Sequence, residues 1–256
     1  MALDVNPRQK CETTLYGISL VITRYEYVDM YHTLKDLWNA FMSLPKGVEK
    51  VDRAILFDSH PKGYLDSVWS DLFGATMHIH QVEEGTCLEQ VILVPPGYSN
   101  VLNPLGRLFT GNCCRSMSDA FVDFVVKSCD LENIMKLDDS VLILGQVRHI
   151  DHPRSAPEVV EQGRATILDR VPFVSHSRSN SSHEERAIAN LDVLEGKVKH
   201  MTNATTVQIV DLLQEPFLDQ LRLIRQSHVL IGHSDSGISQ MIFMQNGTHV
   251  FKLGDA

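Results

Sequence analysis

The stretch from Thr205 to Leu253 constrains the fold more than any other, because short apolar segments alternate in it with a helical pattern. Residues 205–211 are rich in β-branched side chains, which favour a strand. Phe217, Leu221 and Ile224 then recur at the spacing of one helix face. This part of the chain therefore predicts strands joined by helices, as in half of a Rossmann-type domain.

A short polar loop lies where this pattern would bind a ligand. The apolar run 228–231 predicts a buried parallel strand, and residues 238–243 predict a short helix after it. The loop between them joins the carboxyl end of a strand to a helix N-terminus, a place where such folds hold anions. We therefore expect a nucleotide or phosphate site formed by Gly232, His233, Ser234, Asp235, Ser236 and Gly237.

The same alternation extends through the rest of the chain and predicts parallel sheets in an α/β protein. Expected strands cover residues 15–24, 53–58, 90–94, 140–147 and 171–175, and expected helices cover 29–43, 64–73, 118–137 and 182–194. The polar, aperiodic stretch 149–170 suits an interdomain connection. It divides the chain into two Rossmann-like domains, an N-terminal one (1–148) and a C-terminal one (171–256).

Charge and hydropathy exclude several classes of function. The net charge of −9, with no basic block, argues against a nucleic-acid partner. No apolar run approaches the roughly 18 residues of a membrane span, and residues 1–11 have no apolar core that would mark a signal peptide. The five cysteines are too few and too irregularly spaced for a zinc framework, and their pairing stays open.

One predicted helix carries a candidate acid–base pair. Asp29 suits the N-cap of a helix whose apolar stripe consists of Met30, Leu34, Leu37 and Phe41. His32 and Asp36 lie four residues apart on the opposite face, so their side chains can meet. Such a pair is either part of a catalytic site or an ordinary solvated helix face.

Other polar residues are weaker candidates. Asp58 and His60 end a predicted strand at a possible cleft edge, although Asp58 is equally suited to capping a helix or a turn. His149, Asp151 and His152 cluster in the sequence but form an incomplete ligand set, so no metal is expected.

Several segments, in order, resemble glycosyltransferase family 61, which includes the plant β-1,2-xylosyltransferases of the N-glycan core and the EGF-domain-specific O-GlcNAc transferases. They are Ile22–Phe41, Ala54–His60, Trp69–Phe73, Ile92–Tyr98, Val141–Leu144, His152–Arg154, Phe217–Ile224 and Val229–Gly237. The resemblance implies a GT-B fold, with two Rossmann-like domains facing a cleft and the sugar nucleotide held mainly by the C-terminal one. It also implies a Golgi or endoplasmic reticulum lumen location behind an N-terminal signal or anchor, and helices beyond the last strand.

The activity implied is inverting transfer of xylose or GlcNAc from a UDP-sugar to a glycan or glycoprotein, without a metal or other cofactor. On this basis Asp36, with His32, is the candidate base. Arg148, Arg178, Arg186 and Lys252 join the loop as candidate donor-binding residues. Arg148 is favoured if residues 141–144 open the second domain, and Arg178 if residues 171–175 do.

The donor loop departs from the family pattern. Members usually carry His-Gly-Ala-Gly where this chain has Ser234 to Gly237, and an acidic residue where it has Lys252. His233 could replace the missing histidine by a slip of one residue. Asp235 places negative charge where a diphosphate should bind, so the alternative is a catalytically degenerate member that acts as a binding or scaffolding protein.

Overall fold

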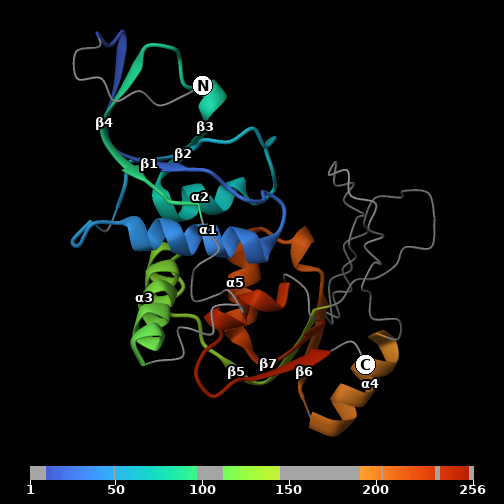
Figure 1. Ribbon diagram of the computed structural model, residues 1–256. Helices are drawn as coiled ribbons and strands as arrows, with labels where there is room; N and C mark the ends of the chain where they lie inside the picture. Colours follow the sequence, from blue (N-terminus) through green and yellow to red (C-terminus); the bar gives the residue numbers. More distant parts are fainter. Residues whose placement is uncertain are drawn as a thin grey trace, which may run out of the picture. The chain divides into compact units, whose positions relative to one another are not determined.

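The computed structural model describes residues 10–48, 50–96, 112–144, 191–202, 204–233 and 237–253 (Figure 1). The chain forms two compact units, Met1–Cys129 and Asp130–Ala256, which we call the N-terminal and C-terminal units. Each unit is built on a four-stranded sheet. Every strand pair in both sheets is parallel, so the α/β class and the parallel sheets predicted from the sequence are confirmed.

The N-terminal unit has the strand order β3-β2-β1-β4. Its elements are β1 (Thr13–Ile22), α1 (Met30–Ser43), β2 (Arg53–Leu56), α2 (Asp66–Phe73), β3 (Ala75–His78), η1 (Ile79–Gln81), β4 (Thr86–Leu93) and α3 (Asn112–Ser128). Two successive crossovers build β1, β2 and β3, and the chain then returns to place β4 on the other side of β1. This order has its switch point between β1 and β4, where Rossmann-type sheets bind ligands at the strands' carboxyl ends.

The core of this unit explains why these segments form these elements. The carboxyl half of β1, from Ser19 to Ile22, is buried, as expected for a central strand of a parallel sheet. Aromatic rings join the three helices: Trp38 of α1 lies 5.2 Å from Phe121 of α3, and Phe73 of α2 lies 5.5 Å from Phe124 of α3, between ring centroids. These contacts hold α1 in place beside the sheet (Figure 1).

A disulfide adds a covalent link to the N-terminal unit. It joins Cys11, just before β1, to Cys87 in β4, a sequence separation of 76 residues. Further along β1, its register with β4 shifts between Leu15 and Ile18, and Gly17 in this interval has a φ of 85°. One of the pairings that the sequence left open is therefore a bond within the N-terminal unit, which ties the segment just before β1 to the neighbouring strand β4.

The C-terminal unit has the strand order β6-β5-β7-β8. Its elements are β5 (Leu137–Leu144), α4 (Leu191–Thr202), β6 (Thr206–Val210), η3 (Leu212–Gln214), α5 (Phe217–Gln226), β7 (Ser227–His233), η4 (Gly237–Phe243) and β8 (His249–Leu253). Alternate residues of β5, β6 and β7 pack with α4 in one core cluster. The switch point of this order lies between β5 and β7.

Two elements in the middle of the chain have the predicted type but differ from the prediction in their bounds or in their partners. The helix expected over 118–137 is α3, which begins at Asn112 and ends at Ser128. Asp130 has a φ of 54°, a left-handed conformation that ends a helix but is more often adopted by glycine. The strand expected over 140–147 is β5, and it pairs with β6 and β7 rather than with strands of the N-terminal half.

The short strand β3 was not predicted, because its four residues contain a single buried side chain and show no clear alternation. Gly74 separates it from α2 with a φ of 79°. The expected connection at 149–170, the strand at 171–175 and the start of the helix at 182–190 lie outside the described residues.

Candidate functional site

Asp36 is buried at the carboxyl end of β1. The Asp29 carboxylate caps α1 by accepting a hydrogen bond from the backbone N–H of His32 at 2.9 Å, as predicted. Asp36 follows one turn later and is 5% exposed. Its Oδ2 accepts a hydrogen bond from the backbone N–H of Tyr25 at 3.0 Å. The side chain therefore points to the segment that leaves β1, not to solvent.

The surroundings of Asp36 make it a stronger base than an ordinary aspartate. Burial raises the pKa of Asp36 to about 6. The hydrogen bond from the Tyr25 N–H and the positive charges of Lys35 and Arg24 lower this pKa, but by less than burial raises it. Asp58 contributes to the rise through its negative charge. At neutral pH such a carboxyl is ionised yet basic enough to accept a proton, the property required of a general base.

His32 does not form the expected pair with Asp36. In the described part of the chain no hydrogen bond joins the two side chains, because Asp36 is directed to Tyr25. The His32 ring lies 4.7 Å from the ring of Tyr25 and 5.4 Å from that of Tyr31, between centroids. Burial lowers the pKa of His32 below its usual value, more than Asp29 and Glu26 raise it. His32 is thus a neutral, aromatic neighbour of the site.

A buried ionic network fixes the segment that follows β1. The Arg24 guanidinium binds both oxygens of Asp58 at 2.8 Å and Oδ1 of Asp66 at 2.6 Å. Nε2 of His78 lies 2.8 Å from the other oxygen of Asp66. The side chains of all four residues are at most 8% exposed. Because each member keeps a partner, the network is geometrically strong and costly to break.

The sequence carries a signal for this network. Arg24 follows β1 by two residues, Asp58 follows β2 by two, and His78 ends β3. Polar residues that end adjacent parallel strands converge at one edge of a sheet. Asp58 is the one member of this set that was predicted as a site residue. It also accepts the N–H of His60 at 3.0 Å, so it serves as both ion-pair partner and turn cap.

In the C-terminal unit, three of the predicted donor-binding residues lie at the same end of the sheet. Gly232 pairs in register with Leu144 of β5 on one side and with Lys252 of β8 on the other, and His233 ends β7. A Cβ at Gly232 would lie 3.3 Å from Cβ of Leu144, so glycine permits close approach of the two strand ends. Lys252 is exposed.

Of the other predicted donor-binding residues, Gly237 alone lies within the described residues. Ser234, Asp235, Ser236, Arg148, Arg178 and Arg186 lie outside the described residues. Gly237 begins η4. The pairing of β5 does make residues 141–144 the opening strand of the C-terminal unit, which is the condition that favours Arg148 over Arg178.

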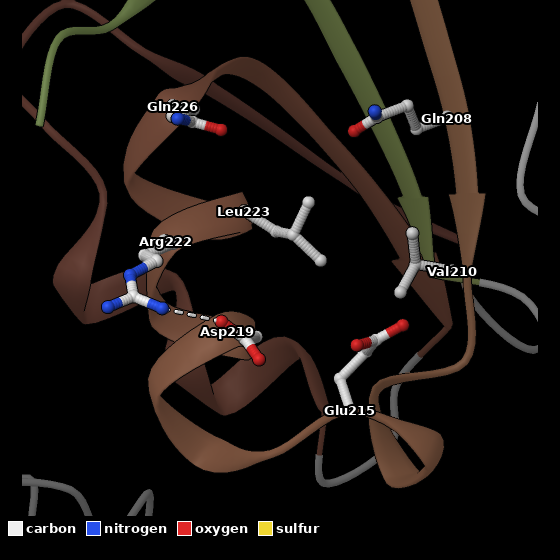
Figure 2. A pocket seen from close by; sticks show the side chains of 7 residues that line it. All are labelled: Gln208, Val210, Glu215, Asp219, Arg222, Leu223 and Gln226. Carbon is white, nitrogen blue, oxygen red and sulfur yellow. Dashed lines mark hydrogen bonds and ion pairs between the residues drawn. The ribbon is translucent and has the colours of Figure 1, made fainter. Parts of the chain in front are cut away.

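A pocket of about 270 Å³ lies between β6 and α5 (Figure 2), and no residue of β5 or β7 is among those that line it. It is lined by Gln208, Val210, Glu215, Asp219, Arg222, Leu223 and Gln226. Its cation, Arg222, is engaged by Asp219 at 2.7 Å, and Glu215 adds a second carboxylate. This charge pattern disfavours a diphosphate.

The sequence of this chain is similar to those of known proteins along most of its length. The sequence profile described as Glycosyltransferase 61 matches residues 30–251. Beta-1,2-xylosyltransferase RCN11 of Oryza sativa subsp. japonica is 22% identical over 250 residues, which cover 95% of this chain and 46% of that protein. Beta-1,2-xylosyltransferase of Arabidopsis thaliana is 20% identical over 259 residues, covering 95% and 48%. The chain spans about half the length of the curated relatives it matches.

Proposed function

Because the chain belongs to glycosyltransferase family 61, we propose that it is an inverting glycosyltransferase. It would move xylose or GlcNAc from a UDP-sugar to a glycan or glycoprotein acceptor. The observation that carries the proposal is Asp36, a buried carboxylate whose pKa is raised to about 6 at the carboxyl end of β1. Xylose is supported further by the names of the two plant relatives.

The reaction needs a base on the acceptor side. Asp36 would take the proton of the acceptor hydroxyl while that oxygen attacks the anomeric carbon of the donor sugar. The bond from the anomeric carbon to the diphosphate oxygen breaks from the opposite face, so configuration inverts and UDP leaves with the bonding electrons. His32 would line the site as a neutral ring, since burial lowers its pKa.

The donor would bind at the carboxyl ends of β5 and β7. Gly232, His233 and Lys252 lie at this edge of the sheet, and Ser234 to Gly237 follow directly from β7. Arg148 comes four residues after Leu144, the partner of Gly232, which makes it our preferred diphosphate ligand ahead of Arg178 and Arg186. The positive side chain of Arg148 or Lys252 would stabilise charge that develops on the departing UDP.

Two further parts of the proposal rest on the resemblance. One is the GT-B arrangement, with both Rossmann-like domains facing a cleft. The other is a location in the lumen of the Golgi or endoplasmic reticulum, which the Cys11–Cys87 disulfide supports because such bonds persist in oxidising compartments. In the described part of the chain, no helix is both long and apolar enough to cross a membrane.

The second candidate is a degenerate family member that binds but does not turn over. Asp235 in the donor loop and Lys252 in place of an acid favour it. In that case Asp36 would keep its buried environment while UDP binding would be lost.

Calorimetry with UDP, followed by transfer assays with UDP-xylose and UDP-GlcNAc on N-glycan and peptide acceptors, separates the two candidates. We expect UDP binding, and transfer that Asp36→Asn lowers by about 10²–10⁴-fold. Asp71→Asn is the matched control, because burial also raises the pKa of Asp71, on α2. The absence of UDP binding at millimolar nucleotide would contradict the proposal that the protein is an active glycosyltransferase. Full turnover by Asp36→Asn would show that Asp36 is not its base.

A further inference from the structure

An exposed aromatic ring lies directly beside the candidate base. Tyr25 donates its backbone N–H to Asp36 at 3.0 Å, yet the residue as a whole is 55% exposed. The ring of His32 packs against it at a centroid distance of 4.7 Å and an angle of 49°. A large apolar surface is therefore presented to solvent next to the carboxylate that would take the acceptor's proton.

The segment that carries Tyr25 is held in place on several sides. Before it, Arg24 is fixed by Asp58 and Asp66 in the buried ionic network. After it, the ring of Tyr27 stacks on that of His60 at 4.9 Å, between centroids, with 24° between planes. A Cβ at Gly63 would lie 2.8 Å from Cδ2 of Tyr27, so this packing is close.

The same segment is also tied at its far end, where the hydroxyl of Tyr64 donates a hydrogen bond to the carbonyl of Val28 at 2.8 Å. A ring on a segment anchored at both ends presents contact area at a small entropic cost on binding. This is the property of a preorganised ligand platform, and it distinguishes Tyr25 from a tyrosine that is simply exposed.

The charge around this ring selects a neutral ligand. Three carboxylates lie around it: Glu26 follows Tyr25 directly, Asp29 caps α1, and Asp36 is ionised above about pH 6. They outnumber the nearby cations, which are Lys35 and the Arg24 guanidinium that is already bound by Asp58 and Asp66. A diphosphate or other anion would be repelled by these carboxylates. A pyranose is uncharged, and the C–H groups of one ring face pack against an aromatic ring while its hydroxyls reach polar neighbours.

We propose that Tyr25, backed by His32, is the platform on which a pyranose ring of the acceptor stacks, so that one of its hydroxyls reaches Asp36. This inference rests on the proposed function and specifies its acceptor subsite. Tyr25 is a binding and specificity residue, whereas Asp36 carries the proton transfer.

Steady-state transfer kinetics test the platform with four variants. Tyr25→Ala and Tyr25→Leu remove the aromatic face, Tyr25→Phe keeps it, and Tyr16→Ala removes a tyrosine that is 71% exposed in the amino-terminal half of β1. Aromatic stacking of about 0.5–1.5 kcal/mol corresponds to roughly a two- to twelvefold rise in acceptor KM for the first two. The KM for the donor should not change. Tyr25→Phe should keep most of the acceptor affinity because it keeps the ring, and Tyr16→Ala should match wild type.

A donor-free measurement separates this inference from the proposed function. Saturation-transfer NMR would use glycans released from a glycoprotein as the probe, with no UDP-sugar present. One outcome is that wild type gives glycan signals that Tyr25→Ala and Tyr25→Leu lose, while wild type shows no transfer. This result would support the Tyr25 platform and overturn the proposed glycosyltransferase activity. Transfer whose acceptor KM is equal in Tyr25→Ala, Tyr25→Leu and Tyr16→Ala would overturn the platform and leave the enzyme standing. No glycan signal from wild type would also overturn the platform.

Discussion

Replacing Asp36 by asparagine should stabilise the N-terminal unit at neutral and alkaline pH. Burial raises the pKa of Asp36 from 3.8 to about 6, so the folded state favours the protonated, neutral form. The ionised form of Asp36 therefore destabilises the folded state. Asparagine is neutral at every pH, and its side-chain oxygen can still accept the hydrogen bond from the backbone N–H of Tyr25.

The size of the effect follows from the rise of about two pH units. At 1.36 kcal/mol per pH unit, it amounts to roughly 3 kcal/mol. The sign follows from proton binding. Below about pH 4 the carboxyl is protonated in both the folded and the unfolded state, so it contributes nothing to pH dependence. Between pH 4 and 6 the folded state binds more protons, so wild-type stability falls with rising pH, and above pH 6 the full cost is present.

Urea unfolding, monitored by tryptophan fluorescence, measures the free energy of unfolding of the N-terminal unit selectively. The two tryptophans of the chain, Trp38 and Trp69, are both buried in the N-terminal unit. At pH 8, Asp36→Asn should unfold with a free energy roughly 3 kcal/mol above that of wild type, and near pH 4 the two should converge. Asp123→Asn, which alters an exposed carboxylate on α3, is the control. A pH-independent difference between Asp36→Asn and wild type, or a less stable variant at pH 8, would refute the reasoning.

Three further outcomes are expected. The transfer rate of wild type should rise with pH to a plateau above about pH 6, because the base must be ionised, and pH–rate profiles would show a flat residual rate for Asp36→Asn. Replacing Cys11 and Cys87 by serine should lower the free energy of unfolding by about 4 kcal/mol, since the bond closes a 76-residue loop, and urea titration would detect it. Arg24→Met should cost about 3–5 kcal/mol by leaving two buried carboxylates without their cation, a loss visible in thermal unfolding and absent if the network is not formed.

The features predicted correctly are those that depend on nearby residues. The start of α1 follows from Asp29, whose carboxylate needs only the N–H groups of the next turn. β7 follows from its apolar run before Gly232. Strands alternating with helices were enough to predict parallel sheets, because parallel neighbours need a crossover between them.

The features that were missed depend on residues far apart in the chain. Membership of β5 in the second sheet is decided by pairing with β6 and β7, more than 60 residues further along. The partner of Asp36 is a backbone N–H eleven residues away, where helical spacing had indicated His32. Helical spacing establishes which side chains share a face, but not which of them a neighbouring segment will engage.

The bond between Cys11 and Cys87 makes the segment from β1 through β3 a covalently closed ring. Asp36, Tyr25 and all members of the ionic network belong to the chain segment that this bond closes. A single proteolytic cut anywhere between the two cysteines would therefore leave both fragments attached to each other. Such a cut would escape detection on a non-reducing gel and appear only after a thiol is added.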